Sequence, residues 1–365
     1  VYKRQLLDLY DHVADHCAPV LLERMCQGWS GARIAERAIH EGEGLHEAMK
    51  LSCGSMSDGF PLTPSQRRAV HAFLSGEEGD VTAVSGPPGT GKTTMLQAVV
   101  ANMLTRHALE GRDAPVIVGT STNNQAVVNI ISSFSSVTRN DPGTLDLRWL
   151  PSAEGMGSTE LRTSEEIQEA RKTPEIQETE KAQEPATTGQ SEGSGAFEAT
   201  PLRSLAVYCP ASSRLREART KYLLEQRNKS ETYTVYSDPR YLGRARDTFV
   251  ARASAHFGSA HDLPGIKGWI TDALAELEEL RLVLVEEMAR HGATDRYARL
   301  CAEAVSSPHL MSLEKVAGLA DCTTLEELDA VLDVTLRYAE FWLAVHHYEA
   351  CWSVSYTHLR AHETK

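Results

Sequence analysis

Apolar residues recur every three or four positions through much of this chain, with polar residues between them. This spacing is typical of amphipathic helices. It predicts helices at residues 6–50, 65–75, 93–104, 124–134 and 269–291. At least two further helices are expected between residues 312 and 352, the second opened by the capping pattern of Thr324 and Glu327.

A helix at 269–291 would carry one continuous apolar face, ended by Gly292. That face comprises Ile270, Ala273, Leu274, Leu277, Leu280, Leu284 and Met288. A similar stripe follows nearer the C-terminus and is expected to be core, namely Tyr338, Phe341, Trp342, Val345 and Tyr348.

Three short runs break the helical period because their apolar residues are continuous. Residues 80–86 (DVTAVSG) and 114–122 (APVIVGTST) read as buried strands, and 205–210 (LAVYCP) as one more short strand. From residue 64 to residue 134 the order is helix, strand, loop, helix, strand, helix. This order predicts an α/β fold with a parallel sheet and right-handed crossovers.

Composition changes sharply after residue 150. Residues 153–200 are rich in Glu, Gln, Thr and Ser and hold 11 Glu against 4 Lys plus Arg. A segment with so few large apolar residues cannot bury enough surface to order itself. We therefore expect an acidic linker or insertion at 151–204.

The loop between the first predicted strand and its helix reads GPPGTGKT and matches G-x-x-x-x-G-K-[ST] at every fixed position. In this motif glycines let the backbone wrap round phosphate oxygens at a helix N-terminus. Lys92 reaches the β- and γ-phosphates of ATP, and the Thr93 hydroxyl binds Mg²⁺. The residues assigned to the nucleotide are Gly86, Pro87, Pro88, Gly89, Thr90, Gly91, Lys92, Thr93 and Thr94.

Two flanking stretches narrow the interpretation. With the loop, residues 60–70 (FPLTPSQRRAV) and 119–130 (GTSTNNQAVVNI) resemble the start of superfamily 1 DNA/RNA helicases, of the large bacterial AAA-domain type. This resemblance implies a RecA-like P-loop NTPase core that uses ATP and Mg²⁺. It also implies that the Gln66 carboxamide reads the adenine edge, although a solvent-facing helix residue is the plain alternative.

The stretch after the second predicted strand resembles the motif that touches the backbone of single-stranded DNA or RNA. Its residues are Thr122, Asn123, Asn124 and Gln125. Neutral hydrogen-bonding side chains can hold phosphates without locking them. A simple helix cap is the alternative for Asn123 and Asn124, and the two roles can coexist.

Phosphate-loop hydrolysis also needs an acidic pair after a neighbouring strand. The candidate at residues 282–288 (LVLVEEM) has Glu286 where Asp is needed and continues a helical stripe, so we reject it. The resemblance places the acidic pair and a second motor domain further along. Residues 1–5 and 353–365 resemble adapter read-through, so the expectation is an N-terminal fragment of a longer protein.

The resulting domain organisation has five parts. A helical segment at 1–57 precedes a partial RecA-like domain at 58–150, the linker at 151–204, a helical insertion at 205–352 and an artefactual tail at 353–365. In the resemblance, the helical insertion is a clamp-like subdomain that borders the path of the nucleic-acid strand.

Net charge and clusters of charged or metal-binding side chains give little further information on function. The net charge of −13 excludes a globally basic nucleic-acid binder, and seven scattered cysteines indicate free thiols in a reducing cytoplasm. We expect no membrane partner, because no apolar run approaches the length of a span. His346 and His347 are adjacent rather than four apart, so we expect packing rather than metal binding. Arg240, Arg244 and Arg246 are expected on a solvated face.

The function that follows is the ATP-binding part of a helicase or translocase, inactive in strand separation as a fragment. A P-loop ATPase of a defence, restriction or regulatory system that remodels a protein partner is the alternative. A pure interaction module with a vestigial nucleotide site is a third, which the complete loop argues against.

Overall fold

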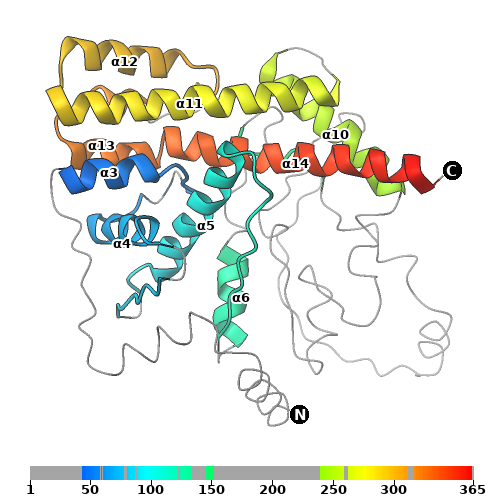
Figure 1. The fold of residues 1–365 in the computed structure, drawn as a ribbon, viewed down its shortest axis with the longest axis horizontal. Helices are drawn as coiled ribbons and strands as arrows, with labels where there is room; N and C mark the ends of the chain where they lie inside the picture. The colour runs from blue at the N-terminus through cyan, green and yellow to red at the C-terminus, as the bar shows by residue number, and fades with distance from the viewer. Residues whose placement is uncertain are drawn as a thin grey trace, which may run out of the picture. The chain divides into compact units, whose positions relative to one another are not determined.

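The computed structural model of the chain describes residues 43–57, 59, 61–77, 80–87, 89–121, 124–133, 145–151, 239–258, 262–310 and 316–363. Its helices (Figure 1) are α3 (Glu43–Leu51), α4 (Pro64–Leu74), α5 (Lys92–Leu109), α6 (Asn124–Ser133), α10 (Pro239–Phe257), α11 (Leu263–His291), α12 (Asp295–Ser306), η4 (Val316–Leu319), α13 (Leu325–Asp333) and α14 (Leu336–Glu363). The predicted helices that fall on described residues are confirmed, but α5 ends five residues later and α11 begins six residues earlier than predicted, and only residues 43–50 of the predicted helical region 6–50 are described.

Capping residues fix where two of these helices begin. Thr63 accepts a hydrogen bond from the backbone N–H of Gln66, whose side chain binds the Thr63 backbone in return. Thr324 and Glu327 form the same reciprocal box at the start of α13, as the sequence predicts. Each box satisfies N–H groups that the first helical turn leaves without partners.

The predicted sheet is not confirmed. Residues 80–87 and 112–121 have no regular secondary structure, and no strand occurs among the residues that the structure describes. Their apolar side chains face solvent, with Val116 91% and Val118 80% exposed. A strand needs a neighbour for its backbone hydrogen bonds, and the described residues supply none here. Residues 205–210 lie outside the described part of the chain.

The described residues fall into two compact units. The first comprises residues 1–118 and 272–344, and the second residues 119–271 and 345–365. In the first unit α3 packs on α4 and α13, while α4 packs on α5. The α4–α5 contact is a small apolar core, made of Leu62, Val70, Leu74, Met95, Ala98 and Val99.

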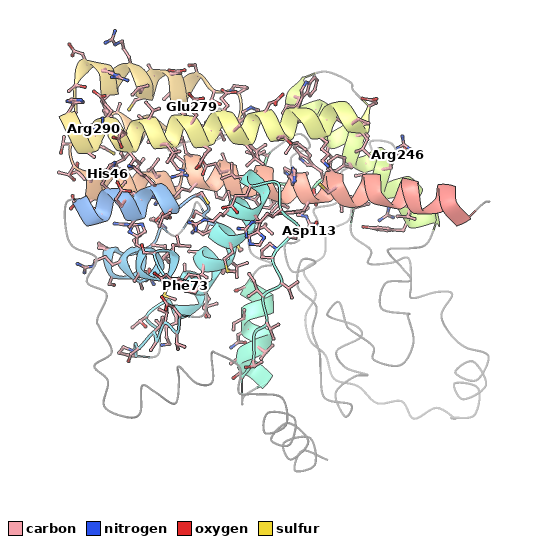
Figure 2. All side chains as sticks on the ribbon, in the orientation of Figure 1. His46, Phe73, Asp113, Arg246, Glu279 and Arg290 are labelled. Carbon is pink, nitrogen blue, oxygen red and sulfur yellow. The ribbon has the colours of Figure 1, made fainter. Side chains whose placement is uncertain are left out.

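Most of the apolar face of α11 lies in the first unit and is buried. The seven apolar residues predicted for one face of 269–291 are all buried on α11, with Ile270 belonging to the second unit. His46 of α3, labelled in Figure 2, places Nε2 2.7 Å from Oε2 of Glu286 on α11. The LVLVEEM stretch lies within helix α11, so its rejection as an acidic strand is confirmed.

In the second unit a short irregular segment, residues 145–151, is buried throughout. Trp149 stacks on His346 of α14 with ring centroids 3.6 Å apart. His346 bonds Glu349 through Nδ1 at 2.9 Å and the Leu145 carbonyl through Nε2 at 2.7 Å. Packing accounts for His346, as expected, and the described residues hold no cluster suited to a metal.

Two smaller expectations can be checked on α10 and α14. Arg244 and Arg246 are exposed on α10, as expected, whereas the side chain of Arg240 lies outside the described part. The aromatic stripe of α14 is buried except at Tyr348, which is only partly covered. None of the described helices is both long and apolar enough to cross a membrane.

Candidate nucleotide-binding site

The phosphate loop turns sharply into α5 because two glycines adopt left-handed backbone conformations. Gly89 has φ 82° and Gly91, the N-cap of α5, has φ 73°. Residues with a Cβ rarely adopt such angles. At Gly91 a Cβ would also collide with the carboxamide nitrogen of Gln66. Glycine is therefore needed here for the turn, and its lack of a Cβ also leaves room for the end of the Gln66 side chain.

Lys92 is the first residue of α5 and its side chain is exposed. Its ammonium donates to the carbonyl oxygens of Gly86 and Pro87, each at 2.7 Å. The Thr90 hydroxyl donates to the same Pro87 carbonyl at 2.9 Å. The loop thus folds around its own cation. These contacts are open to water, so an anion can replace the two carbonyls at little cost.

Gln66 reaches the loop from α4. Its Nε2 donates to the carbonyl oxygens of Thr90 at 2.9 Å and Gly91 at 3.2 Å. Its Oε1 accepts from the backbone N–H of Thr63 at 2.8 Å. Both ends of the carboxamide are therefore engaged in fixing the loop and the start of α4. Reading an adenine edge would require some of these contacts to be exchanged for contacts with the base.

The remaining loop residues fit a phosphate group with its metal. The first N–H groups of any α-helix lack partners within the helix and carry partial positive charge. At Gly89 no described atom lies within 4 Å of where a Cβ would stand, which leaves the backbone open. Thr93, partly exposed in the first turn of α5, offers a hydroxyl oxygen of the kind Mg²⁺ accepts. Thr94 is equally accessible, and Pro88 lies outside the described residues.

The second candidate motif is only partly described. Thr122 and Asn123 lie outside the described residues. Asn124 and Gln125 form the first turn of α6, which belongs to the second unit, and only their backbone is described. Their role toward nucleic acid therefore stays a prediction.

The sequence patterns missed the polar groups that anchor this site. Arg67, the residue after Gln66, donates through Nε to Oδ2 of Asp329 on α13 at 3.1 Å, and both side chains are buried. Asn102, on the inner face of α5, bonds the backbone of residues 53–54. A buried Asn or Arg at an otherwise apolar helix position is the only signal the sequence offers, and it does not name the partner.

Comparison with known proteins gives one positive result. No curated protein and no solved structure matches the chain. A family model described as an AAA domain matches residues 61–233, just under half of the chain, and this range includes Gln66 and the whole phosphate loop. Residues 61–233 are thereby indicated as a P-loop AAA domain of the superfamily 1 helicase-like kind.

Proposed function

We propose that this chain carries the ATP-binding part of an ATP-dependent helicase or translocase, which couples ATP hydrolysis to movement along single-stranded DNA or RNA. The observation that carries the proposal is the geometry of the loop. Gly89 and Gly91 turn the backbone, Lys92 places an exposed cation against it, and Gln66 holds it from α4. The AAA-domain match supports nucleotide use at this loop.

Three residues of the site have distinct roles in this proposal. Lys92 exchanges its two carbonyl partners for phosphate oxygens, and the N-terminus of α5 faces the same negative charge. Thr93 holds Mg²⁺, which neutralises phosphate charge when it is bound. Gln66 gives up a loop contact to meet the adenine edge. In the nucleotide-competent form, residues 80–87 and 112–121 become strands of the P-loop sheet.

The nucleic-acid side rests on Thr122, Asn123, Asn124 and Gln125, of which the last two begin α6. Neutral hydrogen-bonding residues there suit a protein that must bind and release phosphates in turn. Helices of residues 205–352 border the strand path in this proposal. Hydrolysis needs an acidic pair that none of these motifs supplies, so we expect the 365-residue chain to bind ATP without separating strands.

Calorimetric titration of Mg-ATP into the purified 365-residue chain tests the nucleotide site. We expect binding by the unchanged chain and its loss in Lys92→Ala. Lys50→Ala is the matched control, because Lys50 lies on α3 and pairs with Glu47 of the same helix and with Glu286 of α11. Equal affinity in all three proteins would contradict the site.

A second measurement addresses the nucleic acid. The anisotropy of a labelled single-stranded oligonucleotide should report binding that weakens in the Asn123→Ala/Asn124→Ala double variant, with Mg-ATP affinity unchanged. Oligonucleotide affinity equal to that of the unchanged chain would instead favour an ATPase that remodels a protein partner.

A further inference from the structure

Successive residues of α4 face two different parts of the first unit. Gln66 contacts the phosphate loop, and Arg67 contacts Asp329 on α13. Adjacent residues on a helix point about 100° apart, so one short helix can hold both contacts at once. α4 is thus a rigid link between the nucleotide loop and α13.

Asp329 is the junction of this link. Three side chains converge on its carboxylate: Arg67 Nε at 3.1 Å, His71 Nε2 at 3.4 Å and Arg337 Nη1 at 2.8 Å. All four side chains are less than 10% exposed. Because Arg67 and His71 are one turn apart on α4, the carboxylate fixes both the position and the rotation of that helix.

The charge of Asp329 is maintained inside the protein. Burial alone raises the pKa of its carboxyl, but the charge of Arg337 and the contact with His71 outweigh burial and hold the pKa below its ordinary value. Asp329 is therefore ionised at neutral pH, and Arg67 keeps an anionic partner.

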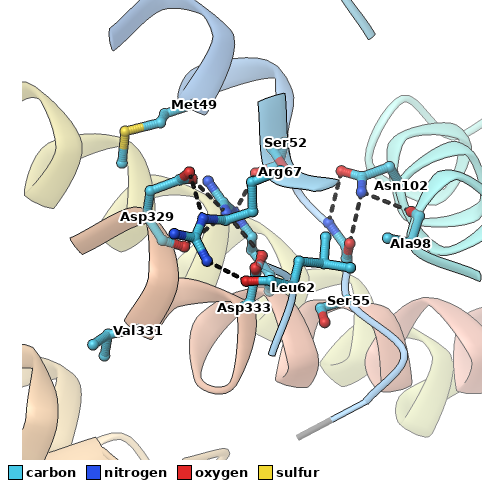
Figure 3. A network of polar contacts seen from close by, with 12 residues as sticks. Met49, Ser52, Ser55, Leu62, Arg67, Ala98, Asn102, Asp329, Val331 and Asp333 are labelled. Carbon is cyan, nitrogen blue, oxygen red and sulfur yellow. Dashed lines mark hydrogen bonds and ion pairs between the residues drawn. The ribbon is translucent and has the colours of Figure 1, made fainter. Parts of the chain in front are cut away.

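The same scaffold also holds α5, the helix that begins with Lys92. Arg337 donates through Nε to the carbonyl of Ser52 at 3.0 Å, and the N–H of Ser55 donates to the carbonyl of Arg337 at 3.0 Å. Asn102 of α5 then accepts from the N–H groups of Cys53 and Gly54 at 2.8 and 3.1 Å. Figure 3 shows Ser52, Ser55 and Asn102 in the same view as Arg67, Asp329 and Asp333.

Gly54 makes this close approach possible. A Cβ there would stand 2.5 Å from the carbonyl oxygen of Ala101 on α5. Residues 52–55 therefore lie directly against α5 on one side and bond Arg337 on the other. One buried polar network on α13 and α14 therefore holds two helices: α4, whose Gln66 contacts the loop, and α5, which begins with Lys92.

From this closed network we propose that Asp329 is a positioning residue for the nucleotide site: through Arg67 it sets the position of Gln66 and hence the geometry of the phosphate loop. The inference rests on the proposed ATP site. Asp329 touches no nucleotide itself. Loss of its charge releases α4, and the carbonyl oxygens of Thr90 and Gly91 lose a fixed partner.

The test compares Asp329→Asn with Asp333→Asn in the 365-residue chain. Asp333 lies one turn on, is equally buried and pairs with Arg337 at 2.9 Å, but among the described residues no hydrogen bond or ion pair joins it to α4. Mg-ATP affinity is measured by calorimetry at a temperature where circular dichroism shows both variants folded. We expect about tenfold weaker binding in Asp329→Asn only, within the usual range for coupled sites.

Equal affinity of the two variants would overturn the positioning role while leaving the ATP site intact. Absence of binding by the unchanged chain would overturn the ATP site and the positioning role together. The two failures are thus distinguishable.

Amide hydrogen exchange in the unchanged chain keeps the inference testable where Asp329→Asn does not fold. Because coupling is reciprocal, Mg-ATP should slow exchange in α13 (Leu325–Asp333), and Arg67→Ala, compared at saturating Mg-ATP, should abolish that slowing. Exchange in α13 that is indifferent to Mg-ATP would overturn the coupling.

Discussion

α14 and the two segments at 80–87 and 112–121 both carry large apolar residues, but these side chains end in opposite environments. In α14 every residue from Leu336 to His347 is buried, including Phe341 and Trp342 at 0% exposure. In the segments, Val81 is 55% exposed, and Val116 is 91% exposed. Hydrophobicity alone therefore does not decide which part of this chain reaches the core.

The difference follows from where each element finds its backbone hydrogen bonds. A helix satisfies its N–H and C=O groups within itself, so α14 can be surrounded by other helices as soon as its side chains pack. A strand must pair with a neighbour before it can be buried without cost. The phosphate loop connects a segment that lacks a partner strand with a self-contained helix, because it leads from residues 80–87 into α5.

The largest expected effect lies in α14. Phe341→Ala removes a fully buried ring that lies 5.7 Å from the ring of Trp342. The cavity and the lost burial should cost about 3–5 kcal/mol of unfolding free energy. Urea unfolding followed by circular dichroism measures it. Ile117→Ala, in an exposed segment, is the matched control and should change stability by less than about 0.5 kcal/mol.

A second prediction concerns a buried carboxylate on α14. On α14, Glu349 is 3% exposed and accepts from Arg148 and from the N–H of Trp149. Burial alone raises its pKa, but Arg148 and His346 outweigh burial and bring the pKa to about 2, below its ordinary 4.5. A depressed carboxyl pKa stabilises the fold above the unfolded value, and this contribution is lost as pH falls from 4.5 to about 2.

The loss attributable to Glu349 over that window should be about 3 kcal/mol. Urea unfolding of the unchanged chain and Glu349→Gln, at several pH values between 5 and 2, measures it. We expect the variant to be less stable at neutral pH and to lose less stability on acidification. Parallel pH profiles would contradict the assignment.

Much of the helical architecture is predictable from the sequence because its signals are local. The capping box of Thr324 and Glu327, the apolar face of α11 and the glycine turn before Lys92 each lie within a few residues. The strand prediction is not confirmed, because strand formation depends on a partner that is not local in the sequence. The patterns at 80–86 and 114–122 state what those residues prefer, but not whether a partner strand lies beside them.

The site shows the same limit. The motif identifies Lys92, Thr93 and the glycines, since the chemistry of phosphate binding sets their spacing. It cannot identify Asp329, because its contact with Arg67 joins residues 262 positions apart. The sequence patterns also did not predict that residues 145–151 are buried. A segment without regular structure has no periodicity, and Trp149 is held by stacking on His346.

The smallest expected effect tests the exposed segments directly. Val116→Lys introduces a charge at the most exposed of the large apolar residues that the structure describes, so the unfolding free energy of the 365-residue chain should change by less than about 0.5 kcal/mol. A charge placed in a buried strand would instead cost several kcal/mol, because the ammonium would lose its hydration without gaining a partner. Urea unfolding distinguishes the two states, with Val118→Lys as a second position on the same segment. Destabilisation by more than about 2 kcal/mol in both variants would show that residues 112–121 are covered in solution, and the contrast with α14 would then fall.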